Sequence, residues 1–388
     1  MFEKISIGLG LILIPFYSIA GDTRNPKLML ALGFALILSL WVFFKGKLKP
    51  INNKWLYILV GYLFLSIQFA PQFKIPFLGV DTVNLWFWQP FAMVLIFFLM
   101  LHALASLELD IKFYLKIISW VGFIMAVYGL LQFFGLDQFY TLDNVPVSTL
   151  PPSARMTGTL GQPTLFAPFV AMFIPICLYL KKYWMVLIMV IAVLFANSHI
   201  AIFALLGALL FLFGIKNRKQ FILSVSFTVV IFSLLSLGYL NIPKVKVFFS
   251  DSGRFPLWKK TVSDLISPLA KDNPRKYPFT GLGFGSYKYL HDIKHNDDFR
   301  SAHNEYLQFA NETGFIGLVL LLCTMFTFIR NALKERASRY KRHLLASFVC
   351  IALCAGGTFI WKLGAHIYYT IFICGLLLNE TGKENLAK

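Results

Sequence analysis

The residues best placed to do chemistry are a histidine and its neighbours in the segment SAHNEYLQFANETGFIG, residues 301–317. This segment lies where a long polar stretch meets an apolar one. Ser301 has a side chain typical of a helix N-cap, which would make His303 an early residue of the following helix. The partial positive charge of a helix N-terminus disfavours a protonated imidazole, and a neutral imidazole is a competent general base. The segment therefore predicts a base at the end of an apolar helix.

Three arginines precede this segment and have the side chain best suited to phosphate. Arg155 is the only basic residue of the stretch PPSARMTGTLGQPT. Arg254 comes directly before a predicted amphipathic helix at Phe255–Ile266, and Arg300 lies shortly before His303. An arginine guanidinium donates two parallel hydrogen bonds and stays charged. These residues predict an anion-binding site, and the alternative for Arg155 is an interfacial arginine that reaches the lipid headgroups.

Two other patterns in the polar stretch carry a weaker chemical signal. Gly281, Gly283 and Gly285 have a spacing found in nucleotide-binding loops. No strand–helix–strand pattern precedes them, so we interpret them as a tight loop packing at the membrane edge. His291 and His295 are four residues apart and could form a zinc pair, but no third clear ligand accompanies them. We therefore expect no metal and no cofactor.

Membrane helices must position these residues. Hydrophobic residues make up 58% of the 388-residue chain, charged residues 14%, and the mean hydropathy is +0.69. This composition excludes a water-soluble domain. Since about 20 apolar residues cross the hydrocarbon core, the apolar runs predict an all-α polytopic protein with about twelve transmembrane helices. The expected spans are 5–20, 28–44, 55–70, 91–106, 113–135, 162–180, 183–197, 200–215, 221–240, 314–329, 344–360 and 363–379.

The chain has a net charge of +18, and its basic residues are distributed as the predicted topology requires. With the N-terminus in the cytoplasm, 20 Lys and Arg residues fall on cytoplasmic segments, five on short outer segments and 11 in the long loop at 242–313. This positive-inside pattern places both termini in the cytoplasm and the long loop outside. We therefore interpret the basic run at 330–342 as a topology anchor near anionic lipid, and we expect no nucleic-acid partner.

The chain reads as one integrated domain with three parts. Residues 1–241 form an N-terminal membrane bundle, residues 242–313 form the long outer loop with short helices and the catalytic residues, and residues 314–388 form the C-terminal membrane helices. The five cysteines all fall in apolar spans, so no disulfide framework is implied. Ionisable residues are scarce at the centres of the spans, which disfavours an ion-coupled transporter.

Three patches of the sequence resemble the O-antigen ligase and polymerase superfamily, membrane glycosyltransferases that use polyprenyl-diphosphate-linked glycans. They are R-x-T-G-T-x-G-x-P-T at Arg155–Thr164, G-R-x-x-x-W at Gly253–Trp258 and H-N-x-x-L-x-x-x-x-E-x-G-x-x-G at His303–Gly317. The order of the patches, the number of spans and the long outer loop also match. Residues 1–140 match only in hydropathy.

The resemblance implies a role for several residues. His303 would be the base that activates an acceptor sugar hydroxyl, while cationic side chains hold the diphosphate. The candidates for holding the diphosphate are Arg155, Arg254, Arg300 and His199. The residues expected to support the site are Asn304, Glu312 and Trp258. His199 is a departure, because the superfamily often has Ser-Arg-small where this chain has Ser198-His199-Ile200; Arg300 or Arg275 could then supply the missing charge.

The resemblance also implies the partners and the compartment. The donor would be a glycan linked to undecaprenyl diphosphate, and the acceptor a lipid A core sugar or another glycan. A single displacement would invert the anomeric centre, without a metal or a cofactor. The protein would lie in the inner (cytoplasmic) membrane of a bacterium, in contact with the lipid bilayer, with its active site facing the periplasm.

Other functions remain open at the level of sequence. The same residues serve ligation of a finished glycan and polymerisation of polyprenyl-linked repeat units. A small-solute transporter is a third possibility, which the clustered outer Arg and His residues disfavour. A fourth is a metal-dependent glycosyltransferase with Asp22 as base, although an aspartate in the stretch GDTRNP is typical of a turn.

Overall fold

The computed structural model describes most of the chain. It covers residues 2–17, 25–69, 89–137, 141–142, 145–146, 156–214, 254–266, 278–287, 301–334, 338–358, 360–361 and 363–379. These residues are helical apart from turns, short connections and one antiparallel pairing of β1 (Thr141–Leu142) with β2 (Val145–Pro146). The predicted all-α class is therefore confirmed over this part of the chain. The predicted span at 221–240 lies outside the described residues.

Thirteen helices are described. They are α1 (Phe2–Phe16), α2 (Asn25–Phe44), α3 (Lys54–Phe69), α5 (Gln89–Ser106), α6 (Ile111–Phe133), α8 (Pro163–Ala171), α9 (Ile174–Tyr179), α10 (Tyr183–Phe195), α11 (His199–Gly214), α14 (Arg254–Ile266), α16 (Glu305–Lys334), α17 (Arg339–Ala355) and α18 (Gly364–Leu378). Within the described residues, three segments are long and apolar enough to cross a membrane by themselves: Pro26–Phe44, Ile111–Phe133 and Glu305–Leu333.

Two predicted spans differ from the helices found. The expected span at 162–180 is divided, because α8 ends at Ala171 and α9 begins at Ile174. Pro175 follows at once; its ring lacks the N–H that would donate to the carbonyl of Ala171 in a continuous helix, so the series of helical hydrogen bonds is interrupted here. The expected span at 314–329 is only the second part of α16, which begins nine residues earlier and is kinked at Gly314.

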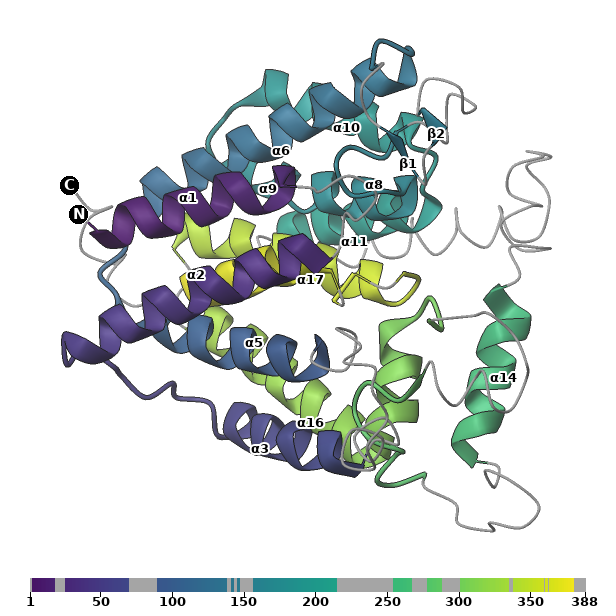
Figure 1. The fold of residues 1–388 in the computed structure, drawn as a ribbon. Coiled ribbons are helices and arrows are strands. Elements are labelled where there is room, and N and C mark those ends of the chain that lie inside the picture. The colour runs from purple at the N-terminus through teal and green to yellow at the C-terminus, as the bar shows by residue number, and fades with distance from the viewer. Residues whose placement is uncertain are drawn as a thin grey trace.

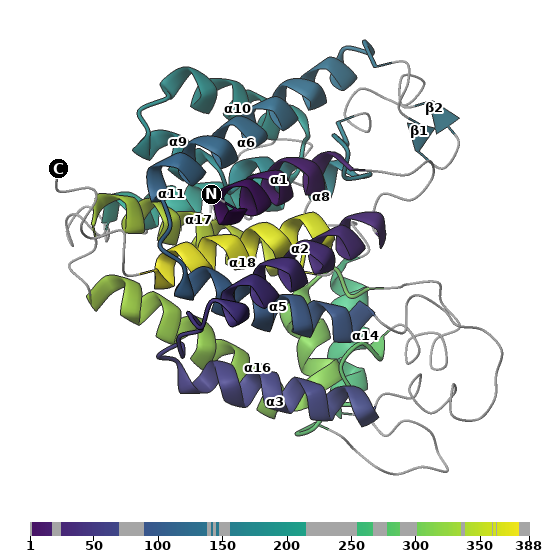
Figure 2. The same cartoon turned by 60° about the vertical axis from the view of Figure 1, so that its left-hand side comes forward.

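The helices pack with α18 at the centre of the bundle. Figure 2 shows α18 between α2, α5 and α17, and it contacts all three. Its residues are buried except for Thr370 and Leu378, which are half-buried. Large apolar side chains such as Leu9, Phe43 and Leu187 are exposed on the outer surfaces of α1, α2 and α10, as expected of helices that face lipid.

The helix ends collect at two opposite ends of the bundle. Figure 1 shows the start of α1 and the end of α18 at one end, which we call the terminal end. Here Lys4 Nζ lies 3.3 Å from Asp110 Oδ2, and Asn379 Nδ2 donates to the carbonyl of Leu107 at 2.7 Å. The other end carries α14, whose axis runs across those of α1, α2 and α6. We call it the α14 end.

The kink in α16 is stabilised by the glycine loop, residues 278–287. At Gly314 the backbone is left-handed, with a φ of 69°, and the helix breaks. The amides of Phe315 and Ile316 then donate to the carbonyls of Pro278 (2.8 Å) and Phe279 (3.1 Å). Because the loop satisfies the freed backbone groups, α16 can change direction beside the membrane boundary. A Cβ on Gly314 would collide with the carbonyl of Phe279.

Candidate functional site

His303 lies in a short connection that we call the His303 turn, residues 301–304, directly before α16. Its backbone is left-handed, with a φ of 51°, and its side chain is half-buried. Asn304, and not Ser301, caps the helix: Asn304 Oδ1 accepts from the amide of Leu307 at 3.1 Å. The expectation that Ser301 is the cap is therefore wrong, because Ser301 lies too far upstream and its Oγ instead accepts from the amide of His303 at 3.4 Å. His303 precedes the helix N-terminus.

The peptide groups before His303 are held from two sides. The indole Nε1 of Trp258 donates to the carbonyl of Ala302 at 3.0 Å. The amide of Ala302 donates to Gln308 Oε1 at 3.2 Å. One partner comes from α14 and the other from α16, so the two helices together set the backbone that carries His303. Fixed backbone of this kind holds a reacting side chain in one position.

Gln308 is a residue that the sequence did not single out. Its Nε2 donates to Glu312 Oε1 at 2.9 Å, while its oxygen accepts from Ala302. The other carboxylate oxygen of Glu312 accepts from the amide of Gly285 at 2.9 Å. Glu312 is fully buried, so this carboxylate connects the His303 turn to the glycine loop. The sequence signal for this pair was its spacing, because residues four apart on a helix, such as Gln308 and Glu312, lie on the same face and can form a hydrogen bond.

Glu305 is a second residue that the sequence did not single out. It is the first residue of α16 and is 4% exposed. Its Oε1 accepts from the amide of Trp361 at 2.9 Å, in the connection between α17 and α18. The neighbouring Tyr306 donates to the carbonyl of Ala352 at 2.8 Å, and its ring lies 5.3 Å from that of Trp361. The start of α16 is therefore attached to both α17 and α18.

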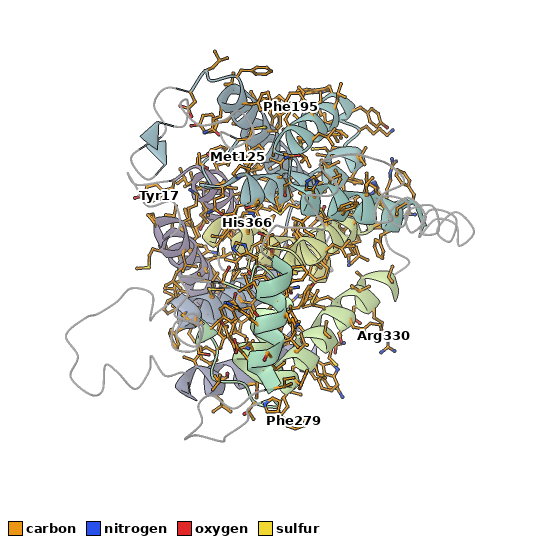
Figure 3. The ribbon with its side chains drawn as sticks, turned by 90° about the vertical axis from the view of Figure 1, so that its right-hand side faces the viewer. Tyr17, Met125, Phe195, Phe279, Arg330 and His366 are labelled. Atoms are coloured by element: carbon orange, nitrogen blue, oxygen red, sulfur yellow. The ribbon has the colours of Figure 1, made fainter. Side chains whose placement is uncertain are left out.

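α14 brings Arg254 to the same end of α16. Asn311 Nδ2 donates to the carbonyl of Thr261 at 3.1 Å, and Trp258 contacts Ala302. These two contacts show that α14 and the first part of α16 run in the same direction. Arg254, the first residue of α14, therefore begins this helix one turn before Trp258, toward the His303 turn. Figure 3, a view onto the α14 end, shows α14 lying across the other helices.

A buried tyrosine also holds α14 in place. Tyr287, in the glycine loop, has its hydroxyl 2.8 Å from Thr261 Oγ1. Burial raises the pKa of Tyr287 to about 12, so the hydroxyl stays neutral and able to donate at physiological pH. The amphipathic helix predicted at Phe255–Ile266 is thus present, and its inner face is fixed by hydrogen bonds to two other segments.

His199 lies at the start of α11 and is half-buried. Its neighbour Ile200 packs against Gly357, where a Cβ would lie 2.6 Å from Ile200 Cδ1. Gly357 belongs to the same connection between α17 and α18 that holds Trp361. The start of α11 and the start of α16 therefore both contact the connection between α17 and α18. Arg155 and Arg300 lie outside the described residues, and Arg254 is described by its backbone alone.

The segment that follows Arg155, residues 156–165, is well defined. Gln132 Oε1 accepts from the amides of Thr157 at 3.2 Å and Gly158 at 2.8 Å. Gln132 Nε2 donates to Asp137 Oδ2 at 3.0 Å, which fixes the orientation of the amide. Lys27 Nζ donates to the carbonyl of Thr159 at 2.7 Å. The patch thus lies at the α14 end, where α2 begins.

An apolar cavity of about 140 Å³ lies beside the His303 turn, between α3, α5, α16 and α18. Glu305, Gln308 and Glu312 border it on α16. The remaining lining is mostly apolar and includes Leu63, Val94, Phe97, Leu321, Phe328 and Ile371. A dry cavity of this size admits an apolar group of roughly six carbon atoms. Within the described residues no group of three His, Cys, Asp or Glu side chains could hold a metal, and the pair His291 and His295 lies outside them.

Comparison with known families decides the assignment. Residues 184–322 match the family model described as O-antigen ligase. Over this stretch, which is less than half of the chain, the sequence is similar to the O-antigen ligase family. The match contains two of the three patches, those at 253–258 and 303–317, and the resemblance drawn from them is confirmed. No curated protein matches the chain.

The match to the O-antigen ligase model has general consequences. It implies a glycosyltransferase-like ligase or polymerase with polyprenyl-linked glycan and lipid acceptor substrates. Together with the apolar helices it indicates a membrane location and a place in lipopolysaccharide biosynthesis. The patch at Arg155–Thr164 falls outside the matched residues, so its role remains a proposal.

Proposed function

We propose that this protein is a membrane glycosyltransferase that moves a glycan from undecaprenyl diphosphate to an acceptor sugar hydroxyl at the periplasmic face. The observation that supports this proposal is the His303 turn. Trp258 and Gln308 hold the backbone of Ala302, directly before His303, and an apolar cavity lies beside the turn. A positioned histidine and an apolar chamber at one membrane boundary suit a substrate with a lipid tail and a sugar head. The family assignment supports the same class of reaction.

The reaction is a single displacement. A neutral ring nitrogen of His303 takes the proton of the acceptor hydroxyl as its oxygen attacks the anomeric carbon. The bond between that carbon and the phosphate oxygen breaks, and undecaprenyl diphosphate leaves with the electron pair. Attack opposite the leaving group inverts the anomeric centre. No metal is required, because the diphosphate is already a good leaving group once its charge is neutralised.

Arg254 and Arg155 are the proposed partners of the diphosphate, with Arg300 and His199 as further candidates. The parallel course of α14 and α16 supports this role for Arg254, since both helices begin near the His303 turn. Guanidinium groups aimed at the departing phosphate oxygens stabilise the charge that develops in the transition state. The donor's isoprenoid chain would continue from the diphosphate into the apolar helices, with the cavity beside α16 holding part of it.

The orientation in the membrane follows from charge. We infer a polytopic protein of about twelve spans with both termini in the cytoplasm of a bacterial cell. The two ends of the bundle support this inference, because basic residues gather at the terminal end, opposite α14. Exposed examples at that end are Lys45, Lys47, Lys49, Lys112, Lys116 and Arg339. The His303 turn would then face the periplasm, where finished lipid-linked glycans are used.

The test is glycan transfer by purified protein in EDTA, from undecaprenyl-diphosphate glycan to a lipid A core acceptor. We expect wild-type protein to transfer glycan, His303→Ala to be at least about 100-fold slower, and His343→Ala to retain activity. His343 is a matched control, since it is half-buried at the terminal end, where its Nδ1 lies 2.7 Å from the carbonyl of Arg339 and its ring packs against Tyr179. Lengthened polyprenyl-linked products would identify a polymerase instead of a ligase. Full activity of His303→Ala would remove the proposed base.

A further inference from the structure

Three exposed lysines lie toward the terminal end on α6 and at the start of α10. Figure 1 and Figure 2 both show these two helices side by side at the edge of the bundle. Lys116 stands in the second turn of α6, and Lys181 and Lys182 directly precede α10. Over the described part of the chain none of the three has a carboxylate partner, whereas Lys4 at the same end is paired with Asp110 at 3.3 Å.

Ring contacts show how the two helices are aligned. The rings of Trp120 and Trp184 lie 5.9 Å apart near the start of α10. The rings of Phe133 and Phe195, at the other ends of the two helices, lie 4.8 Å apart. α6 and α10 therefore run in the same direction. The lysines precede this tryptophan pair by four residues on α6 and by two or three on α10, so the lysines of both helices lie on its terminal side.

Beyond the tryptophans the exposed surface of the same two helices is apolar. On α6 the order is Lys116, Trp120 and Ile124, which are spaced four residues apart and so share one face. All three are exposed, Ile124 to 47%. On α10 Trp184 is followed by Leu187, which is 62% exposed. Both helices thus present basic, aromatic and aliphatic side chains in the same order.

This order matches the layers of one phospholipid leaflet. Ammonium groups attract the phosphates of anionic headgroups, tryptophan rings favour the headgroup level, and aliphatic side chains face the acyl chains. Lysines without a local carboxylate favour an anionic lipid over a zwitterionic one, whose headgroup brings a positive charge of its own. A second copy of the chain fits this face less well, because a symmetric contact would bring the lysines of both copies together.

We propose that Lys116, Lys181, Lys182, Trp120 and Trp184 form a binding site for an anionic phospholipid, with the lysines at its phosphate. We call these five residues the α6–α10 lipid site. The inference needs only the membrane location and does not rest on the proposed function. It goes beyond that function, because the site lies toward the terminal end, while the His303 turn lies at the α14 end.

Native mass spectrometry of the purified full-length protein measures the binding of dioleoylphosphatidylglycerol, with dioleoylphosphatidylcholine as a zwitterionic lipid of the same acyl chains. We expect wild-type protein to bind the anionic lipid at least about tenfold more tightly. Its affinity should fall about 20-fold in Lys116→Gln/Lys182→Gln and stay within about threefold in Lys116→Arg/Lys182→Arg, which retains both charges.

The matched control removes the same charge elsewhere at the terminal end. Lys47 and Lys49 are exposed in the connection between α2 and α3. We expect Lys47→Gln/Lys49→Gln to bind dioleoylphosphatidylglycerol within about twofold of wild type, since screening limits the reach of exposed charges to about 10 Å. Equal affinity of wild type for the two lipids, or an equal loss in the control and in Lys116→Gln/Lys182→Gln, would overturn the proposal.

Thermal unfolding provides an independent measurement. The substituted lysines are exposed, so Lys116→Gln/Lys182→Gln without added lipid should unfold at the wild-type temperature. Added dioleoylphosphatidylglycerol should raise the unfolding temperature by about 4 °C in wild type and by less than about 1 °C in this variant, because a ligand that binds the native state stabilises it. If wild type is a dimer that separates in this variant, the face contacts a second copy and the lipid site is wrong.

Discussion

The proposed base, His303, depends on neighbours that are not themselves reactive. His303 is attached to α16 through a left-handed backbone conformation, and the peptide before it is held by Trp258 and Gln308. Two hydrogen bonds to Ala302, one from Trp258 and one to Gln308, therefore fix the backbone from which the imidazole extends. Changes at those two side chains should reduce turnover without touching substrate.

Gln308 offers the first test at this scale. Gln308→Ala leaves the buried amide of Ala302 and one oxygen of Glu312 without their partner, which costs about 1–3 kcal/mol. We expect kcat to fall by about 10- to 100-fold, because a displaced base loses alignment. The measurement is steady-state transfer together with thermal unfolding. Ser347→Ala, which removes a buried hydroxyl bonded to the carbonyl of His343, should lower stability alone.

Trp258 provides a more conservative change. Trp258→Phe retains an aromatic ring against α16 but removes the indole N–H that bonds Ala302. A fall in kcat of about tenfold with a loss of about 1 kcal/mol of stability is expected. Trp184→Phe is the matched control, since Trp184 is 47% exposed on α10 and its ring packs against those of Trp120 and Phe123. Equal effects of both changes would contradict a special role for Trp258.

At the scale of elements, the kink in α16 separates the part that carries the site from the part that crosses the bundle. The hydroxyl of Tyr62, on α3, lies 2.7 Å from the carbonyl oxygen of Thr313 and 3.1 Å from that of Thr280. The carbonyl of Glu312 accepts from the amide of Gly283 at 2.8 Å. The glycine loop and α3 thus replace the helical hydrogen bonds that are lost at Gly314, and they fix the angle of the site-bearing part.

Gly314→Ala tests the kink. The left-handed backbone disfavours any side chain, and a Cβ would overlap the carbonyl of Phe279, so the glycine loop must move. We expect a loss of more than about 2 kcal/mol of stability and little remaining transfer. Gly33→Ala in α2 is the control, because nothing lies within 4 Å of the added Cβ. Its stability should be unchanged or slightly raised. Wild-type activity in Gly314→Ala would show that the kink does not position the site.

Periodicity and local signals predicted many elements but not their interruptions. The helix predicted at Phe255–Ile266 is present, and the apolar run at 183–215 is divided between α10 and α11. The kink at Gly314 was missed because the amides that follow it find partners in the glycine loop, 37 residues earlier in the chain. Contacts across such distances leave no periodic pattern in a sequence.

The candidate site shows the same limit. His303, Trp258 and Glu312 were predicted as site residues from the sequence and its resemblance, whereas Gln308 and Glu305 were not. Their importance comes from partners at Ala302 and Trp361, which only the packing of α16 against α17 and α18 reveals.

At the scale of the whole molecule, the two ends of the bundle must face different compartments for the proposed reaction to work. A membrane-impermeant maleimide distinguishes them through Lys259→Cys, exposed on α14, and Lys47→Cys, exposed at the terminal end. The native cysteines are buried or half-buried, so wild-type protein measures the background.

We expect Lys259→Cys to be labelled in intact spheroplasts and Lys47→Cys only after permeabilisation, because basic segments stay on the cytoplasmic side. The physical consequence is large, since a polyprenyl-linked glycan does not cross the bilayer unaided: only an α14 end in the periplasm gives the His303 turn access to glycans in the outer leaflet. The reverse labelling pattern would place His303 in the cytoplasm. The donor would then have to be used before export, and transfer to a lipid A core would have to occur in the inner leaflet.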